Sequence, residues 1–403
     1  MNYISISVYF LLALSLAIGI KIAPRRGFNQ NFLSLDATNC LKGVMAIFVL
    51  MHHLSQKKLF QQTHTIPFFE QIGFLFVGVF FLTSGYGLYK SFLTKKDYLN
   101  AFLKRRILPL VLSYYVMVII YAAYHLINKS NFTPAEWIFK LSGLVAINSQ
   151  SWFVPVIILM YLSFYFIYKN ERLRKIGIPL LLLITFLQGL LFCIINHFPW
   201  YIGESGWWKQ PGAFSNLPWW MRHCALPFEG EWWVNSTIGF VLGIAVAKHE
   251  KALIEWSSKK YWPKFILIIL LTSLLTFAGF FCCWNISYWT EFGGNLGTMN
   301  KLICYLVQCL QVLVTDIFIL FLMRKVYVQN SFYRFCGERS LEIYLMQETA
   351  LFGWLFLIEK DRQPLIKSGN WNLILYMILV TATVMLSAII YHSLNKAIKK
   401  TIS

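Results

Sequence analysis

The chain has 403 residues, of which 58% are apolar and 18% aromatic, while only 13% are charged. A soluble globular domain carries about 25% charged residues, and several apolar runs in this chain reach the roughly 20 residues that cross a bilayer core. Composition therefore excludes a soluble globular protein and indicates a polytopic membrane protein. The formal net charge of +19 invites a nucleic-acid interpretation. However, basic residues in membrane proteins mark cytoplasmic loops, and the sequence contains no basic stripe, so we expect no nucleic-acid partner.

Eleven apolar segments are long enough to form helices that span the bilayer, some of them only with flanking interfacial residues. They are 3–20, 41–55, 68–91, 107–127, 152–168, 177–195, 233–247, 264–283, 301–323, 339–358 and 372–394. With the N-terminus outside and the C-terminus in the cytoplasm, 26 of the 36 Lys and Arg residues fall on the cytoplasmic side. Because cytoplasmic loops are enriched in basic residues, the charge pattern favours this orientation. The sequence predicts an all-α polytopic membrane protein with about eleven transmembrane helices.

The first apolar segment, 3–20, differs from a secretory signal peptide. No charged residue precedes it, and Lys21, Arg25 and Arg26 follow it without a small-residue cleavage pattern. We interpret it as a retained helix that begins outside. The eight cysteines show no spacing typical of metal ligands, since Cys282 and Cys283 are adjacent and the others are scattered. We therefore expect no metal site.

The second segment carries ionisable side chains at membrane depth. Lys42 lies where the chain would enter the bilayer from the cytoplasm, and His53 follows eleven residues later, about 16 Å along a helix. Eleven helical steps bring both side chains to one face, whereas His52 points about 80° away. One interpretation is a general base at His53 with positive charge at Lys42. The other is a packing histidine with a snorkelling lysine, and the spacing alone leaves both open.

Six motifs follow one another in an order that resembles the acyltransferase-3 family of integral membrane acyltransferases. They are Lys42-Gly43 with His53, FFLTSGYGL at 80–88, FLKRRILPLVLSYY at 102–115, SWFVPVIILMY at 151–161, GFVLGIAVA at 239–247 and SLEIYLMQE at 340–348. The family usually has ten core helices. The resemblance therefore implies that residues 1–34 are an extra N-terminal helix with a basic cytoplasmic linker, and that residues 35–403 form the acyltransferase-like membrane domain.

Three positions depart from the family pattern. Lys42 stands where many members have arginine, which keeps the charge but loses the bidentate fork. Asn39 stands where an acid is often found, and Gln347 stands where a histidine often follows the Ile-Tyr-Leu segment. A proton-transfer role at position 347 is thereby put in doubt, although Gln347 can still orient a substrate through hydrogen bonds.

The resemblance implies transfer of an acyl group, usually acetyl, from cytoplasmic acyl-coenzyme A to a hydroxyl of a cell-envelope glycan. Such an acceptor would belong to a capsule, an exopolysaccharide, an O-antigen or a lipid-linked glycan, and the enzyme would lie in the bacterial plasma membrane. In this interpretation His53 is the catalytic base or a transient acyl carrier, and Lys42 assists it. Acetyl-coenzyme A is the expected donor, the bilayer and the glycan are the other partners, and a homo-oligomer is left open.

The same resemblance assigns further residues to the two substrates. Arg105 and Arg106 would bind the donor phosphates, although a positive anchor at the cytoplasmic face explains them without any ligand. Ser84 and Gly85 would let the pantetheine chain approach, and tight helix packing explains them nearly as well. The residues expected to contact substrate are Trp152, Tyr344, Gln347 and Glu348.

Two other functions are compatible with the sequence. A transporter or flippase of a glycan or glycolipid would use His53, Asp316 and Glu348 as a proton relay, but no repeat relates the two halves of the chain. An inert relative would bind glycan or donor without catalysis. The Trp-rich loop 196–232 is either an acceptor surface or part of the interfacial aromatic belt.

Overall fold

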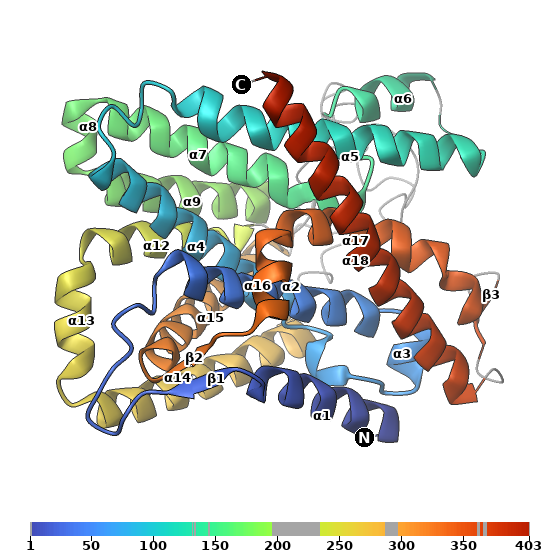
Figure 1. The fold of residues 1–403 in the computed structure, drawn as a ribbon, viewed down its shortest axis with the longest axis horizontal. Helices are drawn as coiled ribbons and strands as arrows, with labels where there is room; N and C mark the ends of the chain where they lie inside the picture. Colours follow the sequence, from blue (N-terminus) through green and yellow to red (C-terminus); the bar gives the residue numbers. More distant parts are fainter. Residues whose placement is uncertain are drawn as a thin grey trace. The chain divides into compact units, whose positions relative to one another are not determined.

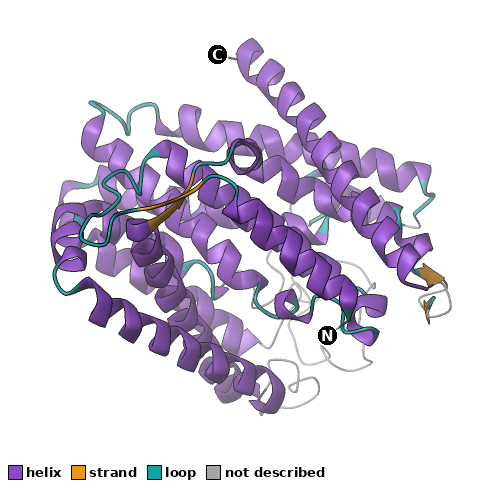
Figure 2. Ribbon diagram, turned by 60° about the horizontal axis from the view of Figure 1, so that its bottom comes forward, coloured by secondary structure: helices purple, strands orange, loops and turns teal. Residues whose placement is uncertain are grey.

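The computed structural model describes residues 2–130, 132, 134–143, 146–195, 234–286, 297–360, 363–365 and 369–402. Within these residues the chain is almost entirely helical, with two short strand pairs (Figures 1 and 2). Each of the eleven predicted apolar segments contains a helix among its described residues. The all-α prediction is therefore confirmed for the described part of the chain.

The helices alternate between long apolar elements and short polar connectors. In chain order they are α1 (Tyr3–Ala17), α2 (Leu35–Ser55), α3 (Lys58–Gln62), α4 (Gly73–Thr94), α5 (Leu108–Ile127), α6 (Pro134–Leu141), α7 (Phe153–Lys169), α8 (Glu171–Lys175), α9 (Gly177–Ile195), α12 (Ile238–Lys248), α13 (Glu250–Ser258), α14 (Tyr261–Phe281), α15 (Gly297–Lys325), α16 (Ser331–Glu338), α17 (Ser340–Gly353) and α18 (Gly369–Ile402). Three short 3₁₀ turns are η1 (Pro67–Phe69), η3 (Ser149–Trp152) and η5 (Leu355–Leu357), and two π-helical turns are η2 (Leu103–Ile107) and η4 (Cys282–Ile286).

Six of the described helical stretches are long and apolar enough to cross a membrane. They are Leu35–Ser55, Leu103–Ile127, Gln150–Lys169, Tyr261–Ile286, Met299–Lys325 and Trp371–Ile398. Three shorter apolar helices are Tyr3–Ala17, Gly177–Leu190 and Ile238–Lys248. Large apolar side chains on α14, among them Ile266, Leu270, Leu274 and Phe277, are exposed, as lipid contact requires. The chain is a multi-pass membrane protein, and the number of spans and their orientation stay predictions.

The chain divides into two compact units. The first, which we call unit 1, comprises Met1–Phe80 and Ile317–Ser403, and the second, unit 2, comprises Phe81–Asp316. The predicted boundary between an extra N-terminal helix (residues 1–34) and the acyltransferase-like domain (35–403) rests on the family pattern and stays a prediction. In unit 1, α1 and the linker after it are tied to a later segment by an antiparallel strand pair, β1 (Ile20–Ile22) with β2 (Val326–Val328). A second, two-residue pair joins β3 (Glu359–Lys360) to β4 (Gln363–Pro364).

Helices α2 and α16 of unit 1 cross with their backbones in contact. A Cβ atom at Gly43 would lie 1.8 Å from the carbonyl oxygen of Tyr333, and one at Gly337 would lie 1.7 Å from the carbonyl oxygen of Asn39. Only glycine fits at either position, because any side chain would push the two helices apart. The Lys42-Gly43 motif therefore contains a packing residue next to its basic residue.

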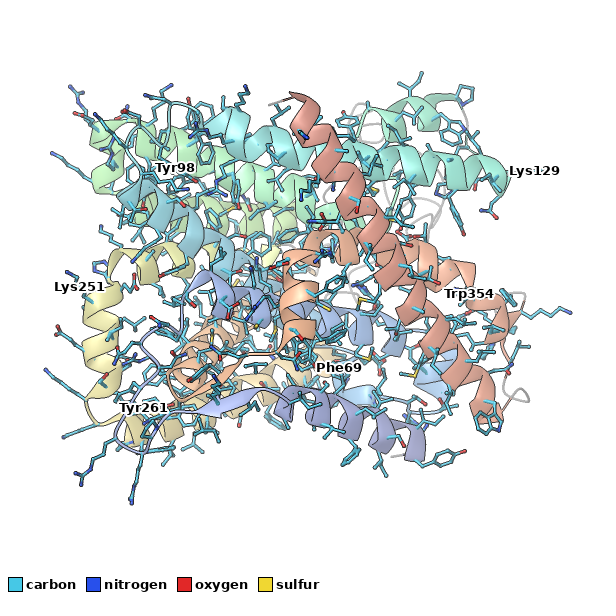
Figure 3. The ribbon with its side chains drawn as sticks, viewed as in Figure 1. Phe69, Tyr98, Lys129, Lys251, Tyr261 and Trp354 are labelled. Atoms are coloured by element: carbon cyan, nitrogen blue, oxygen red, sulfur yellow. The ribbon has the colours of Figure 1, made fainter. Side chains whose placement is uncertain are left out.

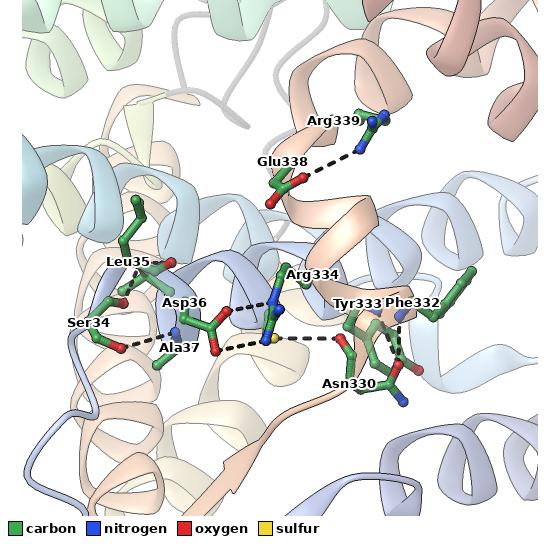
Figure 4. A network of polar contacts seen from close by, with 12 residues as sticks. Ser34, Leu35, Asp36, Ala37, Asn330, Phe332, Tyr333, Arg334, Glu338 and Arg339 are labelled. Atoms are coloured by element: carbon green, nitrogen blue, oxygen red, sulfur yellow. Dashed lines mark hydrogen bonds and ion pairs between the residues drawn. The ribbon is translucent and has the colours of Figure 1, made fainter.

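Polar contacts fix the ends of the same two helices (Figure 4). The Ser34 hydroxyl accepts a hydrogen bond from the Ala37 N–H at the start of α2. The Asn330 side chain accepts hydrogen bonds from the N–H groups of Phe332 and Tyr333 at the start of α16. Such caps satisfy amide groups that have no partner inside the helix. The guanidinium of Arg334 bonds both carboxylate oxygens of Asp36, at 2.5 and 3.1 Å, and so joins α16 to α2.

In unit 2, glycines again let two helices approach closely. A Cβ atom at Gly85 of α4 would lie 2.1 Å from the carbonyl oxygen of Phe240 in α12, and one at Gly243 would lie 2.1 Å from the carbonyl oxygen of Leu82. The family-like stretches FFLTSGYGL and GFVLGIAVA are therefore the two sides of one helix crossing. Packing thus accounts for Gly85, which the sequence left open between a helix contact and a contact with the donor.

Candidate functional site

His53 is held by a residue 294 positions away in the sequence. Its Nδ1 atom lies 2.6 Å from the Oε1 atom of Gln347, which belongs to α17 of the same unit. An amide oxygen only accepts hydrogen bonds, so Nδ1 carries the hydrogen and Nε2 keeps its lone pair. The imidazole is half-buried, whereas Gln347 is fully buried. The contact therefore fixes the tautomer that can take a proton through Nε2.

His52, the neighbour of His53, has a different environment. Its Nδ1 atom lies 2.7 Å from the carbonyl oxygen of Phe69, which is labelled in Figure 3 and lies in η1. Its ring also packs against the start of α4, where a Cβ atom at Gly73 would lie 2.3 Å from the imidazole Cδ2. These contacts direct the His52 side chain toward η1 and the start of α4. His52 holds the connection between α2 and α4.

Lys42 lies on the same continuous helix as His53. α2 runs unbroken from Leu35 to Ser55, so the helical rise separates the two positions by about 16 Å. The Lys42 side chain is half-buried, and the Glu338 carboxylate at the end of α16 attracts it. The structure thus places Lys42 and His53 toward opposite ends of α2, and the role of Lys42 in catalysis stays a prediction.

The two acids on α17 both have basic partners. The Glu342 carboxylate is buried and lies 3.0 Å from Nδ1 of His392 in α18. Glu348, one turn after Tyr344, interacts electrostatically with Lys57. A carboxylate at membrane depth is costly without a partner, and the contact with His392 lowers this cost for Glu342.

Lys57 is the residue at this site that sequence reasoning missed. It follows the end of α2, caps the start of α3, and lies one helical turn beyond His53 in sequence. Its ammonium is 4.5 Å from the ring centroid of Phe352, one turn after Glu348 on α17. Its position in a short polar connector gave no sign of a role.

In unit 2, the two arginines of η2 differ in their contacts. Arg105 is exposed. Arg106 is half-buried, donates through Nε to the hydroxyl of Tyr98 at 2.8 Å, and lies with Nη2 3.4 Å from the Ser91 hydroxyl. Tyr98 is labelled in Figure 3. Arg106 is therefore a fixed part of unit 2, whereas the charge of Arg105 faces the surroundings.

The other predicted residues of unit 2 lie in packed surroundings. Ser84 hydrogen-bonds Tyr161 of α7, and Tyr161 also interacts electrostatically with Arg106. Trp152 is buried at the start of α7, with its ring centroid 6.3 Å from that of Phe153. Ser84 is thereby linked through Tyr161 to the η2 turn that carries the two arginines. Trp152 is part of the buried core. A contact of either residue with substrate stays a prediction.

Two further predictions concern buried charge and metal. Asp316 is fully buried in α15, and neither of its carboxylate oxygens has a hydrogen-bond partner among the described residues. Over those same residues, no three His, Cys, Asp or Glu side chains come together as metal ligands. The Trp-rich loop 196–232 lies outside the described residues.

These features define a class of protein: a helical, multi-pass membrane protein with an oriented imidazole in its membrane domain. The profile of the acyltransferase-3 family, described as an acyltransferase domain, matches residues 35–392. The chain therefore belongs to this family and is a membrane acyltransferase, as the motif order predicted. No curated protein and no solved structure shows a significant match to it.

Proposed function

We propose that the protein is an O-acyltransferase that moves an acetyl group from cytoplasmic acetyl-coenzyme A to a hydroxyl of a cell-envelope glycan in the bacterial plasma membrane. The observation that carries the proposal is the hydrogen bond from His53 Nδ1 to Gln347 Oε1, at 2.6 Å. It leaves Nε2 as the proton acceptor, which a general base for hydroxyl activation needs. The family membership supplies the reaction class.

The proposed reaction is a direct transfer. Nε2 of His53 takes the proton of the acceptor hydroxyl while the hydroxyl oxygen attacks the carbonyl carbon of the thioester. The carbon–sulfur bond then breaks, and the imidazolium returns the proton to the leaving coenzyme A thiolate. In the alternative route the Nε2 lone pair attacks the thioester first and carries the acyl group. Hydroxylamine trapping of an acyl-imidazole would separate the two routes.

For the donor, we assign the two arginines of η2 different tasks. Arg105 is exposed and has five guanidinium donors for phosphate oxygens. Arg106 holds the turn in place through Tyr98 and Ser91. In this proposal Arg105 binds the phosphates of coenzyme A, and Arg106 holds the turn that carries Arg105. A plain anchoring role predicts that neither arginine affects donor binding.

The test is acetyl transfer from radiolabelled acetyl-coenzyme A in membranes that contain the full chain. Asparagine at position 53 keeps a side-chain N–H close to the place of Nδ1 and removes Nε2, so His53→Asn preserves the Gln347 contact and deletes the base. His52→Asn is the matched control, since it keeps a donor for the Phe69 carbonyl. We expect loss of transfer only in His53→Asn. Transfer by His53→Asn at the wild-type rate would overturn the assignment, and a wild-type protein without any turnover of acetyl-coenzyme A would favour the transporter.

A further inference from the structure

A lysine that stands over an aromatic ring lies beside the proposed base. Lys57 comes four residues after His53, and Phe352 comes four residues after Glu348. The Lys57 ammonium stands 4.5 Å from the Phe352 ring centroid, and the ring is 46% exposed. Because His53 bonds Gln347 and Lys57 contacts Phe352, the end of α2 and the connector after it meet the second half of α17 at two places.

Two carboxylates oppose the positive charge of Lys57. Lys57 interacts electrostatically with Glu348 and with Glu359 of β3, and also with His53. Burial lowers the pKa of Lys57, while the two carboxylates act in the opposite direction. Lys57 is therefore a cation that lies over an aromatic ring and interacts with nearby carboxylates.

We propose that Lys57, Glu348 and Phe352 form the acceptor subsite, which takes a neutral polyhydroxylated ring such as a sugar and presents one of its hydroxyls to His53. This inference deepens the proposed function and rests on it. It adds to the proposed function the three residues that contact the acceptor and the expectation that the acceptor is uncharged where it meets them. None of it involves the arginines of unit 2.

The chemistry of the three side chains matches neighbouring hydroxyl groups. An ammonium offers only donors and a carboxylate only acceptors, whereas a hydroxyl does both. One sugar hydroxyl can accept a hydrogen bond from Lys57 while it, or its neighbour, donates one to Glu348. The exposed face of Phe352 provides an apolar surface for the C–H groups of the ring. An anionic acceptor would instead have to compete with Glu348 and Glu359 for Lys57.

The experiment uses the full chain in lipid nanodiscs with acetyl-coenzyme A as the donor. Three probes serve as acceptors: methyl β-D-glucoside and methyl β-D-galactoside, which are neutral, and methyl β-D-glucuronide, which differs from the first by a carboxylate. Variants Lys57→Met and Glu348→Gln remove one charge each. Lys58→Met is the matched control, because Lys58 is the exposed neighbour of Lys57. Binding of each probe, its KM, the KM for acetyl-coenzyme A and hydrolysis without an acceptor are measured.

We expect wild-type protein to bind and acylate a neutral glycoside in preference to the glucuronide. Lys57→Met and Glu348→Gln should raise the acceptor KM on the order of tenfold with the donor KM unchanged, since each removes a hydrogen bond to a charged group. Lys58→Met should match wild type. Preference for the glucuronide, no binding of either neutral probe, or an acceptor KM unchanged in Lys57→Met would overturn the inference. Absence of acetyl-coenzyme A turnover in wild-type protein would instead overturn the proposed function.

Discussion

The polar residues of unit 1 and those of unit 2 are held in different ways. In unit 1, His53 bonds Gln347 and Lys57 contacts Phe352, so the polar groups of α2 and α17 position one another. In unit 2, Arg105 is exposed, while its neighbour Arg106 is bonded to Tyr98. A group that takes a proton must be fixed to a fraction of an ångström, whereas a group that attracts a polyanion acts over a longer range. These contacts fit the reaction site proposed for the first region and the donor contact proposed for the second.

The largest effect should follow from deleting the base. His53→Asn should lower acetyl transfer by about 10³-fold, within the range that general base catalysis contributes. His52→Asn should stay within about threefold of wild type, because its contact with Phe69 is kept. Transfer to a glycan fraction is measured beside expression level and thermal stability of both variants. Equal losses in the two would show that the pair of histidines is structural.

Gln347 should give a smaller effect of a distinct kind. Gln347→Leu removes the acceptor of the His53 Nδ1 hydrogen, so the imidazole can adopt the other tautomer. We expect kcat to fall about tenfold to hundredfold with little change in either KM, as for other groups that orient a catalytic histidine. Gln347→His, the residue often found here in the family, should restore part of the rate. A change confined to the acceptor KM would show that Gln347 serves substrate binding instead.

Much of unit 1 could be predicted from the sequence. Apolar periods and basic loops located the helices, and the eleven-residue spacing put Lys42 and His53 on one helix. The buried acid Glu342 has a partner in His392, as the cost of a carboxylate at membrane depth leads one to expect. The partner of His53 could not be predicted, because Gln347 is 294 residues away and its amide group has no preferred ligand. Lys57 was missed because a lysine in a polar connector looks the same whether or not the fold places an aromatic ring beside it.

In unit 2 the sequence could place the residues without separating their roles. The FLKRRI run predicted a basic turn at the start of a helix, and η2 occurs there. The difference between Arg105 and Arg106 depends on Tyr98 and Ser91, which come from the preceding connector and from α4. Gly85 had two interpretations, and its close approach to the carbonyl group of Phe240 explains the glycine by packing, while a contact with the donor stays a prediction.

Variants of the two arginines test whether unit 2 binds the donor. Arg105→Gln should raise the KM or Kd for acetyl-coenzyme A about tenfold without lowering thermal stability, because its charge is exposed. Arg106→Gln should lower the stability by about 1–3 kcal/mol, since it leaves a buried tyrosine hydroxyl without its donor. Donor titration and thermal unfolding of both variants separate these outcomes. Unchanged donor binding in both variants would show that the η2 turn serves only as a membrane anchor.

The smallest effect is a shift in pH dependence at Lys57. Burial lowers the pKa of its ammonium, with Glu348 and Glu359 opposing, so Lys57 loses its proton at a lower pH than an exposed lysine does. If the ammonium donates to the acceptor, the acceptor KM should rise as the pH increases through this lowered pKa, below the ordinary lysine value of about 10.4. Lys57→Arg should abolish the rise, because a guanidinium stays charged throughout this range. The donor KM, measured at each pH, controls for general loss of structure. Since His53 acts as an unprotonated base, its own titration limits the rate on the acidic side and leaves this alkaline change to Lys57. An acceptor KM that rises equally in wild type and Lys57→Arg would assign the change to another group.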